Sequence, residues 1–159
     1  MFYYILFFAV LLCIYASLYF IYKDDIAIHQ TNVNNFDFSL LYTKQPLIIE
    51  DSIADVNNLI DLWFKANIID DVYVTNLWNR NAHKYLLVYA SDNESEITLY
   101  HASKKLINNI PENDDSMITI KLKNRKILFI PYRWYYNITG NVQLYGIHDY
   151  ITYVISKFL

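Results

Sequence analysis

Residues 125–138 read RKILFIPYRWYYNI, and this stretch decides the fold. Residues 127–130 form a short apolar run, which is typical of a buried strand. Pro131 ends the run, because proline has no backbone N–H to give to a neighbouring strand. Residues 133–139 follow with three aromatic side chains, a composition that favours strands. The stretch therefore predicts a strand, a turn at the proline and a second strand.

On both sides of this stretch, short segments have the apolar or alternating pattern of strands. The segments interpreted as further strands are 46–50, 72–74, 84–90, 96–101, 116–122 and 142–147. The polar residues 91–95 are predicted as the turn of a hairpin. A series of about seven short strands of this kind is typical of a β-sandwich or a small barrel.

Two helices are predicted beside the strands. Ser52 to Asp55 have the pattern of a capping box, and apolar residues follow at helical spacing, so a helix is expected over about 53–66 with one buried face. A closing helix is expected over 149–158, with His148 or Asp149 as its cap. The predicted fold class is thus mainly β, a sandwich or jelly roll with a covering helix and a C-terminal helix.

The opening stretch resembles the second conserved motif of cupins, especially of the JmjC-like branch, in which G-D-x-L-F-I-P-x-G-W-W-H makes a strand, a turn and a strand. Residues 128–131 (LFIP) match the strand and its proline, and Trp134 matches the aromatic residue after the turn. Residues 46–49 (PLII) look like the opening strand of JmjC-type domains. The resemblance covers roughly residues 36–147, and it implies a cupin-like β-domain.

The chain also departs from that motif. The motif glycines fall at Arg125 and Arg133, and the metal-binding histidine falls at Tyr136. The partner motif, H-x-D or H-x-H, is absent. A non-haem Fe(II) dioxygenase needs two histidines and a carboxylate on one face, and the family positions do not supply them. These departures from the motif predict a non-catalytic module without a cofactor.

Three histidines are nevertheless candidate metal ligands: His83 at the start of a predicted strand, His101 at the end of another, and His148 at a helix start. A divergent dioxygenase would need at least two of them to meet within about 5 Å of each other, together with a carboxylate. The alternative is that each is an ordinary structural or solvated side chain. The neighbouring acids Asp70 and Asp71 are interpreted as solvated loop residues.

An aromatic group follows the proline of the opening stretch. Either it fills the core where a metal once lay, or it forms a contact surface for a protein or a sugar, since aromatic residues and arginine dominate binding hot spots. The candidate interaction residues are Tyr132, Arg133, Trp134 and Tyr136. The sugar or small-ligand alternative requires an open cavity near Trp134.

The N-terminal segment differs from the rest of the chain. Residues 1–22 carry no charged side chain, and as a helix they would measure about 33 Å, enough for a bilayer core of about 30 Å. A retained single-pass transmembrane anchor is predicted rather than a cleaved signal peptide, because no basic n-region precedes the apolar run. The expected membrane-interface residues are Tyr3, Tyr4, Tyr19, Tyr22 and Lys23. Residues 23–35 are predicted as a polar tether, and 36–159 as the β-domain.

Composition limits the partners. With 13 basic and 16 acidic residues, the chain lacks the basic excess of a nucleic-acid binder. Its single cysteine, Cys13, excludes an internal disulfide. Abundant Ile, Asn, Tyr and Lys beside two glycines suggest an AT-rich genome, and with the N-terminal segment they resemble proteins of large nucleocytoplasmic DNA viruses. The expected role is structural or protein-binding, at a host endomembrane or a viral internal membrane.

Overall fold

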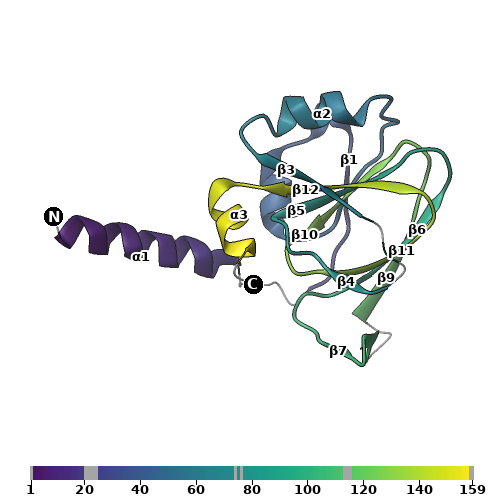
Figure 1. The fold of residues 1–159 in the computed structure, drawn as a ribbon. Helices are drawn as coiled ribbons and strands as arrows, with labels where there is room; N and C mark the ends of the chain where they lie inside the picture. The colour runs from purple at the N-terminus through teal and green to yellow at the C-terminus, as the bar shows by residue number, and fades with distance from the viewer. Residues whose placement is uncertain (1, 20–24, 74, 76, 113–115, 158–159) are drawn as a thin grey trace.

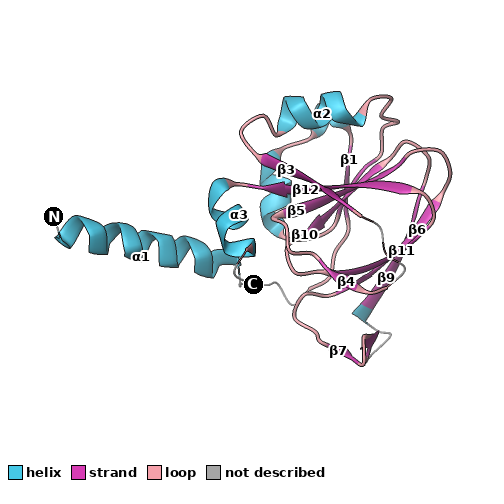
Figure 2. Ribbon diagram, viewed as in Figure 1, coloured by secondary structure: helices cyan, strands magenta, loops and turns pink. Residues whose placement is uncertain are grey.

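The computed structural model describes residues 2–19, 25–73, 75, 77–112 and 116–157. An N-terminal helix, α1 (Phe2–Tyr19), projects from a β-domain, and the C-terminal helix α3 (Tyr150–Ser156) lies near the end of α1 that joins the domain (Figure 1). Strands make up most of the domain (Figure 2). The predicted class, mainly β with a covering and a C-terminal helix, is confirmed.

The larger sheet has six strands, and only its first pair is parallel. In spatial order the strands are β1 (His29–Thr31), β2 (Leu47–Ile49), β10 (Ile127–Pro131), β5 (Tyr85–Ala90), β12 (Val142–His148) and β3 (Ile68–Val72). The smaller sheet has four antiparallel strands, in the order β4 (Asn79–Arg80), β11 (Tyr135–Thr139), β6 (Ser95–Tyr100) and β9 (Met117–Leu122). A separate hairpin joins β7 (Leu106–Ile107) and β8 (Ile110–Pro111).

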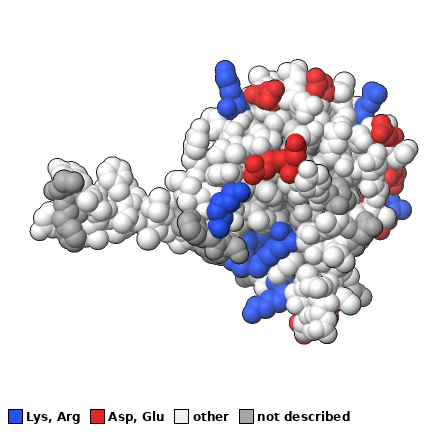
Figure 3. Space-filling model, viewed as in Figure 1, with Lys and Arg blue, Asp and Glu red and all other residues white. Residues whose placement is uncertain are grey.

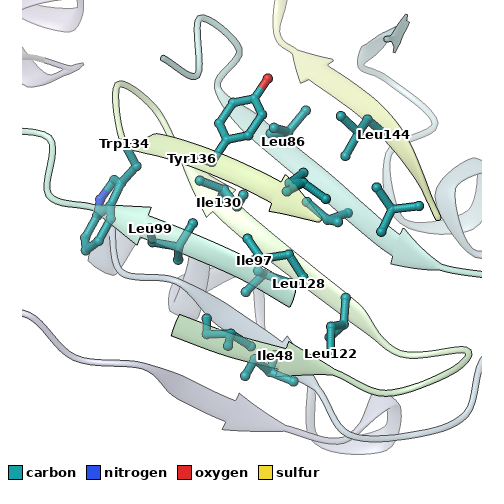
Figure 4. Close-up of a cluster of buried hydrophobic side chains, with 14 of the residues drawn as sticks. Ile48, Leu86, Ile97, Leu99, Leu122, Leu128, Ile130, Trp134, Tyr136 and Leu144 are labelled. Carbon is teal, nitrogen blue, oxygen red and sulfur yellow. The ribbon is translucent and has the colours of Figure 1, made fainter. Parts of the chain in front are cut away.

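The two sheets pack face to face around an apolar core. Leu86 and Leu128 of the larger sheet meet Ile97, Leu99 and Leu122 of the smaller one in a single buried cluster (Figure 4). Burying apolar surface of this kind stabilises the fold by roughly 25 cal/mol per Å². This cluster holds the two sheets together and fixes which side chains face the interior.

A second buried cluster lies on the outer face of the larger sheet. There the helix α2 (Val56–Trp63) and the 3-10 helix η2 (Phe38–Thr43) pack on the sheet through residues such as Val56, Ile60 and Leu41. All six residues of β5 are buried, because the strand is covered on both faces. This explains why residues 85–90 form a continuous apolar run in the sequence.

The predicted strand–proline–strand unit is confirmed: β10 ends at Pro131 and β11 begins at Tyr135 in the other sheet. The two residues at the motif's glycine positions are left-handed, with φ of 59° at Arg125 and 65° at Arg133. Such a conformation costs a non-glycine residue about 1–2 kcal/mol. Both positions therefore have a backbone conformation that glycine adopts without strain.

Several predicted boundaries were wrong. The covering helix begins at Val56 and is capped by Asp55, whose side chain accepts from the Asn58 N–H, so Ser52 is not its cap. Residues 23–35 are not a plain tether, because β1 pairs with β2 and a 3-10 helix, η1 (Val33–Asn35), follows. The closing helix is capped by Asp149 as predicted.

The N-terminal segment is only partly described. In the part of the chain that the structure describes, no helix combines the length and the apolar character needed to cross a membrane. The predicted transmembrane helix is therefore unsupported. Of the predicted interface residues, Tyr3 and Tyr4 are exposed, whereas Tyr22, Lys23 and the side chain of Tyr19 lie outside the described parts.

Candidate metal centre

Two histidines and an aspartate meet at one end of the sandwich. His83 lies in the segment between β4 and β5, His148 is the last residue of β12, and Asp70 lies in the middle of β3. His83 Nδ1 is 2.7 Å from His148 Nε2, and His148 Nε2 is 3.8 Å from Asp70 Oδ2. The three potential ligand atoms lie within 4.8 Å of one another. These residues are called the Asp–His–His cluster below.

Strand register brings the cluster together. Gly146 of β12 is paired with Asp70 of β3 on one side and with Leu86 of β5 on the other, so all three face the same way. Leu86 belongs to the core between the two sheets, which shows that this is the interior face. His148 follows two residues after Gly146 and shares its face, because side chains alternate along a strand. The cluster therefore lies on the interior face, at the end of β12.

The glycine at position 146 makes room for His83. A Cβ on Gly146 would lie 2.3 Å from Nδ1 and 2.5 Å from Cε1 of the His83 ring, closer than real contacts allow. The chain has only two glycines in all, and one of them stands at this position. The ring of His83 thus fits over the backbone of β12 only because position 146 has no side chain.

A buried asparagine fixes the position of His83. The Asn81 Oδ1 accepts a hydrogen bond of 2.9 Å from the His83 N–H. The side-chain amide of Asn81 donates to the carbonyls of Ile130 and Pro131, and its backbone bonds to Arg133 and Trp134. The turn between β10 and β11 therefore supports His83 through Asn81.

Burial keeps both imidazoles neutral. It lowers the pKa of His83 to about 4, helped by the neighbouring His148 and opposed by Asp70. Burial also lowers the pKa of His148, and the charge of Asp70 opposes the shift. A neutral imidazole offers a lone pair to a metal ion, whereas a protonated one does not. Both rings are thus uncharged, as metal binding needs, and a bound ion would take the place of the proton that the two facing nitrogens share.

The burial of His148 has an energetic cost. It is 1% exposed, and among the described residues its Nδ1 has no hydrogen-bond partner. A buried polar atom without a partner costs about 1–3 kcal/mol. In metal sites the second nitrogen of a histidine usually has such a partner, so His148 departs from the usual arrangement in this respect.

The arrangement fits a divalent transition metal ion. Two ligand nitrogens at about 2.0–2.1 Å from one ion lie about 3.0–3.4 Å apart, so the rings need to separate by only a few tenths of an ångström. Asp70 has a side chain that is 39% exposed, and it can move the remaining distance towards the rings. Two imidazoles and one carboxylate leave coordination positions open for water or a ligand.

The sequence identified two of the three residues. It proposed His83, His101 and His148, and the structure brings His83 and His148 together. His101 lies apart: its ring packs edge-on against Trp134 at 4.8 Å, and its Nδ1 is 2.8 Å from Ser103 Oγ. Asp70 was expected in a solvated loop, which was wrong, because it lies in β3. Only the pairing of β3 with β12 reveals that it lies beside the two histidines.

The proposed interaction residues divide into two pairs. Trp134 and Tyr136 are 1% and 6% exposed and belong to the central core, so they offer no contact surface (Figure 4). Burial also raises the pKa of Tyr136. Tyr132 and Arg133 are half-buried and line a cavity of about 330 Å³ with Arg80. The interaction prediction can therefore apply only to this second pair.

No protein-family model matches the chain, and no curated protein matches its sequence. Among solved structures, it is similar to RmlC from Streptococcus suis, solved in complex with dTDP-D-xylose, with a TM-score of 0.31 and 11% sequence identity. The match covers 66% of this chain and 62% of that chain, which is less than two thirds of the length of RmlC. A likeness this weak does not bear on the function.

Proposed function

We propose that this chain is a cupin-like module that binds one divalent transition metal ion through Asp70, His83 and His148. The single observation that carries the proposal is the pair of neutral imidazole nitrogens 2.7 Å apart, with a carboxylate beside them and a glycine that makes room for one ring. The left-handed Arg125 and Arg133 support the cupin-like part of the proposal.

The donor set favours Zn²⁺ or Fe²⁺. Imidazole suits these ions, whereas Mg²⁺ and Ca²⁺ prefer oxygen ligands. A bound ion would supply Lewis acidity at its open positions. The expectation of a non-catalytic module rested on the missing histidine at Tyr136, and the Asp–His–His cluster removes that reason, because it supplies the donors from other positions.

The same proposal places the module at a membrane through its N-terminal segment. Several apolar side chains of α1, including Tyr3, Ile5, Phe7 and Phe8, are 59–81% exposed, and they lie all round the helix. A helix that is apolar on every side is typical of burial in protein or lipid. A place in a viral or host endomembrane, and a protein partner there, follow from the sequence resemblance alone and remain part of this proposal.

Metal binding can be tested on the full chain purified in a non-ionic detergent and stripped with a chelator. Titration with Co²⁺, followed by visible absorption, is expected to saturate at one ion per chain and to be reversed by Zn²⁺. His83→Ala and His148→Ala should each weaken binding by at least about 100-fold, and Asp70→Asn by about 10–100-fold.

Asp71→Asn is the matched control, because Asp71 is the next residue of the same strand and pairs with Tyr145 on the opposite face. It should bind metal like the unchanged chain. Equal loss in Asp70→Asn and Asp71→Asn, or no loss in either histidine variant, would exclude the proposed site.

Membrane attachment has a separate test. The full chain should float with phosphatidylcholine vesicles in a density gradient, and a chain that begins at residue 25 should stay at the bottom. If both forms stay at the bottom, attachment through the N-terminal segment is wrong, while the metal titration still stands on its own.

A further inference from the structure

The two histidines of the Asp–His–His cluster lie at the open end of a strand ladder. Among the described residues, the pairing of β5 with β12 ends at Tyr85 and Ile147. The histidines lie just outside this last pair, His83 before β5 and His148 at the final position of β12. The ladder between these two strands therefore does not by itself set the distance between the two rings.

An ion pair joins the two segments at this point. Lys84 Nζ is 2.8 Å from Asp149 Oδ2. The lysine directly follows His83 and the aspartate directly follows His148, so the pair connects the chain neighbours of both rings. We propose that Lys84 and Asp149 are positioning residues that hold the two histidines at the spacing a metal ion needs. This inference rests on the metal site proposed above.

The ion pair is partly shielded from water. Its lysine and aspartate side chains are 15% and 23% exposed. Lys84 Nζ also lies 5.7 Å from the ring centre of Tyr85 and 5.9 Å from that of Tyr42. Salt screens a shielded pair much less than one on the open surface, where ion pairs contribute little. The pair can therefore hold the two segments together more firmly than an exposed pair would.

The carboxylate of Asp149 is held in place by groups other than Lys84. Its Oδ2 accepts a hydrogen bond of 2.5 Å from Tyr15 of α1, and its Oδ1 accepts one of 2.7 Å from the Thr152 N–H. The second of these bonds caps α3. Asp149 is thus a fixed point, to which Lys84 ties the segment that carries His83. Loss of Lys84 alone removes the tie and leaves the cap of α3 in place.

The segments on the two sides of the pair have separate supports. The backbone N–H of His83 is held by Asn81. His148 pairs with Ile68 of β3, and its carbonyl accepts a hydrogen bond of 3.0 Å from the side-chain amide of Asn67. These supports fix each histidine within its own segment. The Lys84–Asp149 pair acts between the segments, and that is the separation which decides whether both rings can reach one ion.

The same pair brings α1 into contact with the metal site. Basic side chains appear on the domain near the base of α1 (Figure 3). Lys84 belongs to this region, because the carboxylate that it binds also accepts from Tyr15 of α1. One carboxylate therefore serves the end of the N-terminal helix, the cap of α3 and the spacing of the two histidines.

The first test is cobalt titration of variants of the full chain in non-ionic detergent. Lys84→Met removes the charge and keeps much of the side-chain volume, and it should weaken Co²⁺ binding by about tenfold or more, as is usual for residues that support a metal ligand. Lys84→Arg keeps the charge and should bind within about threefold of the unchanged chain. Thr152→Val is the matched control, because it removes a hydroxyl group from the cap of α3 and leaves the ion pair. It should lower the stability without changing metal affinity.

Three outcomes of this titration overturn the proposal. Unchanged affinity in Lys84→Met would show that the ion pair does not set the spacing. Equal loss in Lys84→Met and Thr152→Val would mean that a weakened α3 explains the effect. Equal loss in Lys84→Met and Lys84→Arg would mean that the charge of the lysine is not what matters.

A second measurement needs no metal. The proton between His83 Nδ1 and His148 Nε2 should give a downfield N–H signal in the proton NMR spectrum of the metal-free chain at pH 7.5, and His83→Gln should remove it. Lys84→Met should also abolish the signal, because the rings separate, whereas Thr152→Val should keep it. A signal that persists in Lys84→Met overturns the positioning role even if the chain binds Co²⁺. If Lys84→Met abolishes the signal but the unchanged chain binds no Co²⁺, the positioning role stands and the proposed metal binding is wrong.

Discussion

The interior of the sandwich has two contrasting regions. Around Trp134 and Tyr136 it is packed with apolar side chains, and Tyr136 is the residue that falls at the metal-binding histidine in the sequence resemblance to cupins. At the end of β12 it holds the Asp–His–His cluster, in which polar atoms face one another. The contrast teaches that one sandwich interior can be apolar in one region and hold a polar cluster in another, because different strands supply the two sets of side chains.

The largest effect is expected from Gly146→Ala. The added methyl group would lie 2.3 Å from His83 Nδ1 and must push the ring aside. Metal affinity should fall by about 100-fold, and the free energy of unfolding of the metal-free chain by about 1–3 kcal/mol. Cobalt titration and urea unfolding measure the two effects. If Gly146→Ala binds metal normally, His83 is not a ligand.

Gly140→Ala is a control for this experiment. Gly140 has a φ of 124°, and its substitution also creates a close contact, with Ser95. The variant should therefore lose stability, but it should keep its metal affinity because it lies away from the Asp–His–His cluster. Equal loss of affinity in both variants would mean that general destabilisation explains the result.

Acid should destabilise the metal-free chain through the same cluster. The pKa of His83 is about 4 in the folded chain and about 6.5 when unfolded, so the unfolded state binds more protons between these values. Stability is complete above pH 6.5 and falls as the pH drops towards 4. The loss should be on the order of 2 kcal/mol, allowing for the partial exposure of the ring.

Urea unfolding in the presence of a chelator, at pH 7.5 and pH 4.5, measures this loss. His83→Gln should reduce it, whereas His29→Gln should not, because His29 lies in β1 at the opposite edge of the sheet from β3. An unchanged pH dependence in His83→Gln would show that the ring is not neutral through burial.

The sequence predicted the strands of the core well, because their apolar runs are fixed by burial on one or both faces. It predicted His83 and His148 as candidates but could not join them, since they are 65 residues apart in sequence and meet only through the register of β5 and β12. Asp70 was missed because β3 is an edge strand with half-exposed residues and a weak pattern. A sequence shows which side chains could bind a metal, but it does not show which strands pair and so which of these side chains meet.

A smaller effect, this time an increase in the free energy of unfolding, is expected from Arg125→Gly. Arg125 has a φ of 59°, which a glycine adopts without strain, and its side chain is exposed. Relief of the left-handed strain, reduced by the greater backbone entropy of the unfolded glycine, should raise the free energy of unfolding by about 0.5–1 kcal/mol. Urea unfolding measures the gain, and metal affinity should not change. A loss of stability would mean that the arginine side chain makes a stabilising contact larger than the strain.

The smallest effect is expected from Tyr136→Phe, which separates the two interior regions most directly. The substitution removes only the hydroxyl group from a side chain that is 6% exposed and packed in the core. Stability should change by less than about 1 kcal/mol, because the ring and its apolar contacts remain. Metal affinity should stay within a factor of two of the unchanged chain. A tenfold loss of cobalt affinity would instead place the ion at the position of the cupin motif, and the Asp–His–His cluster would then be a hydrogen-bonded structural group.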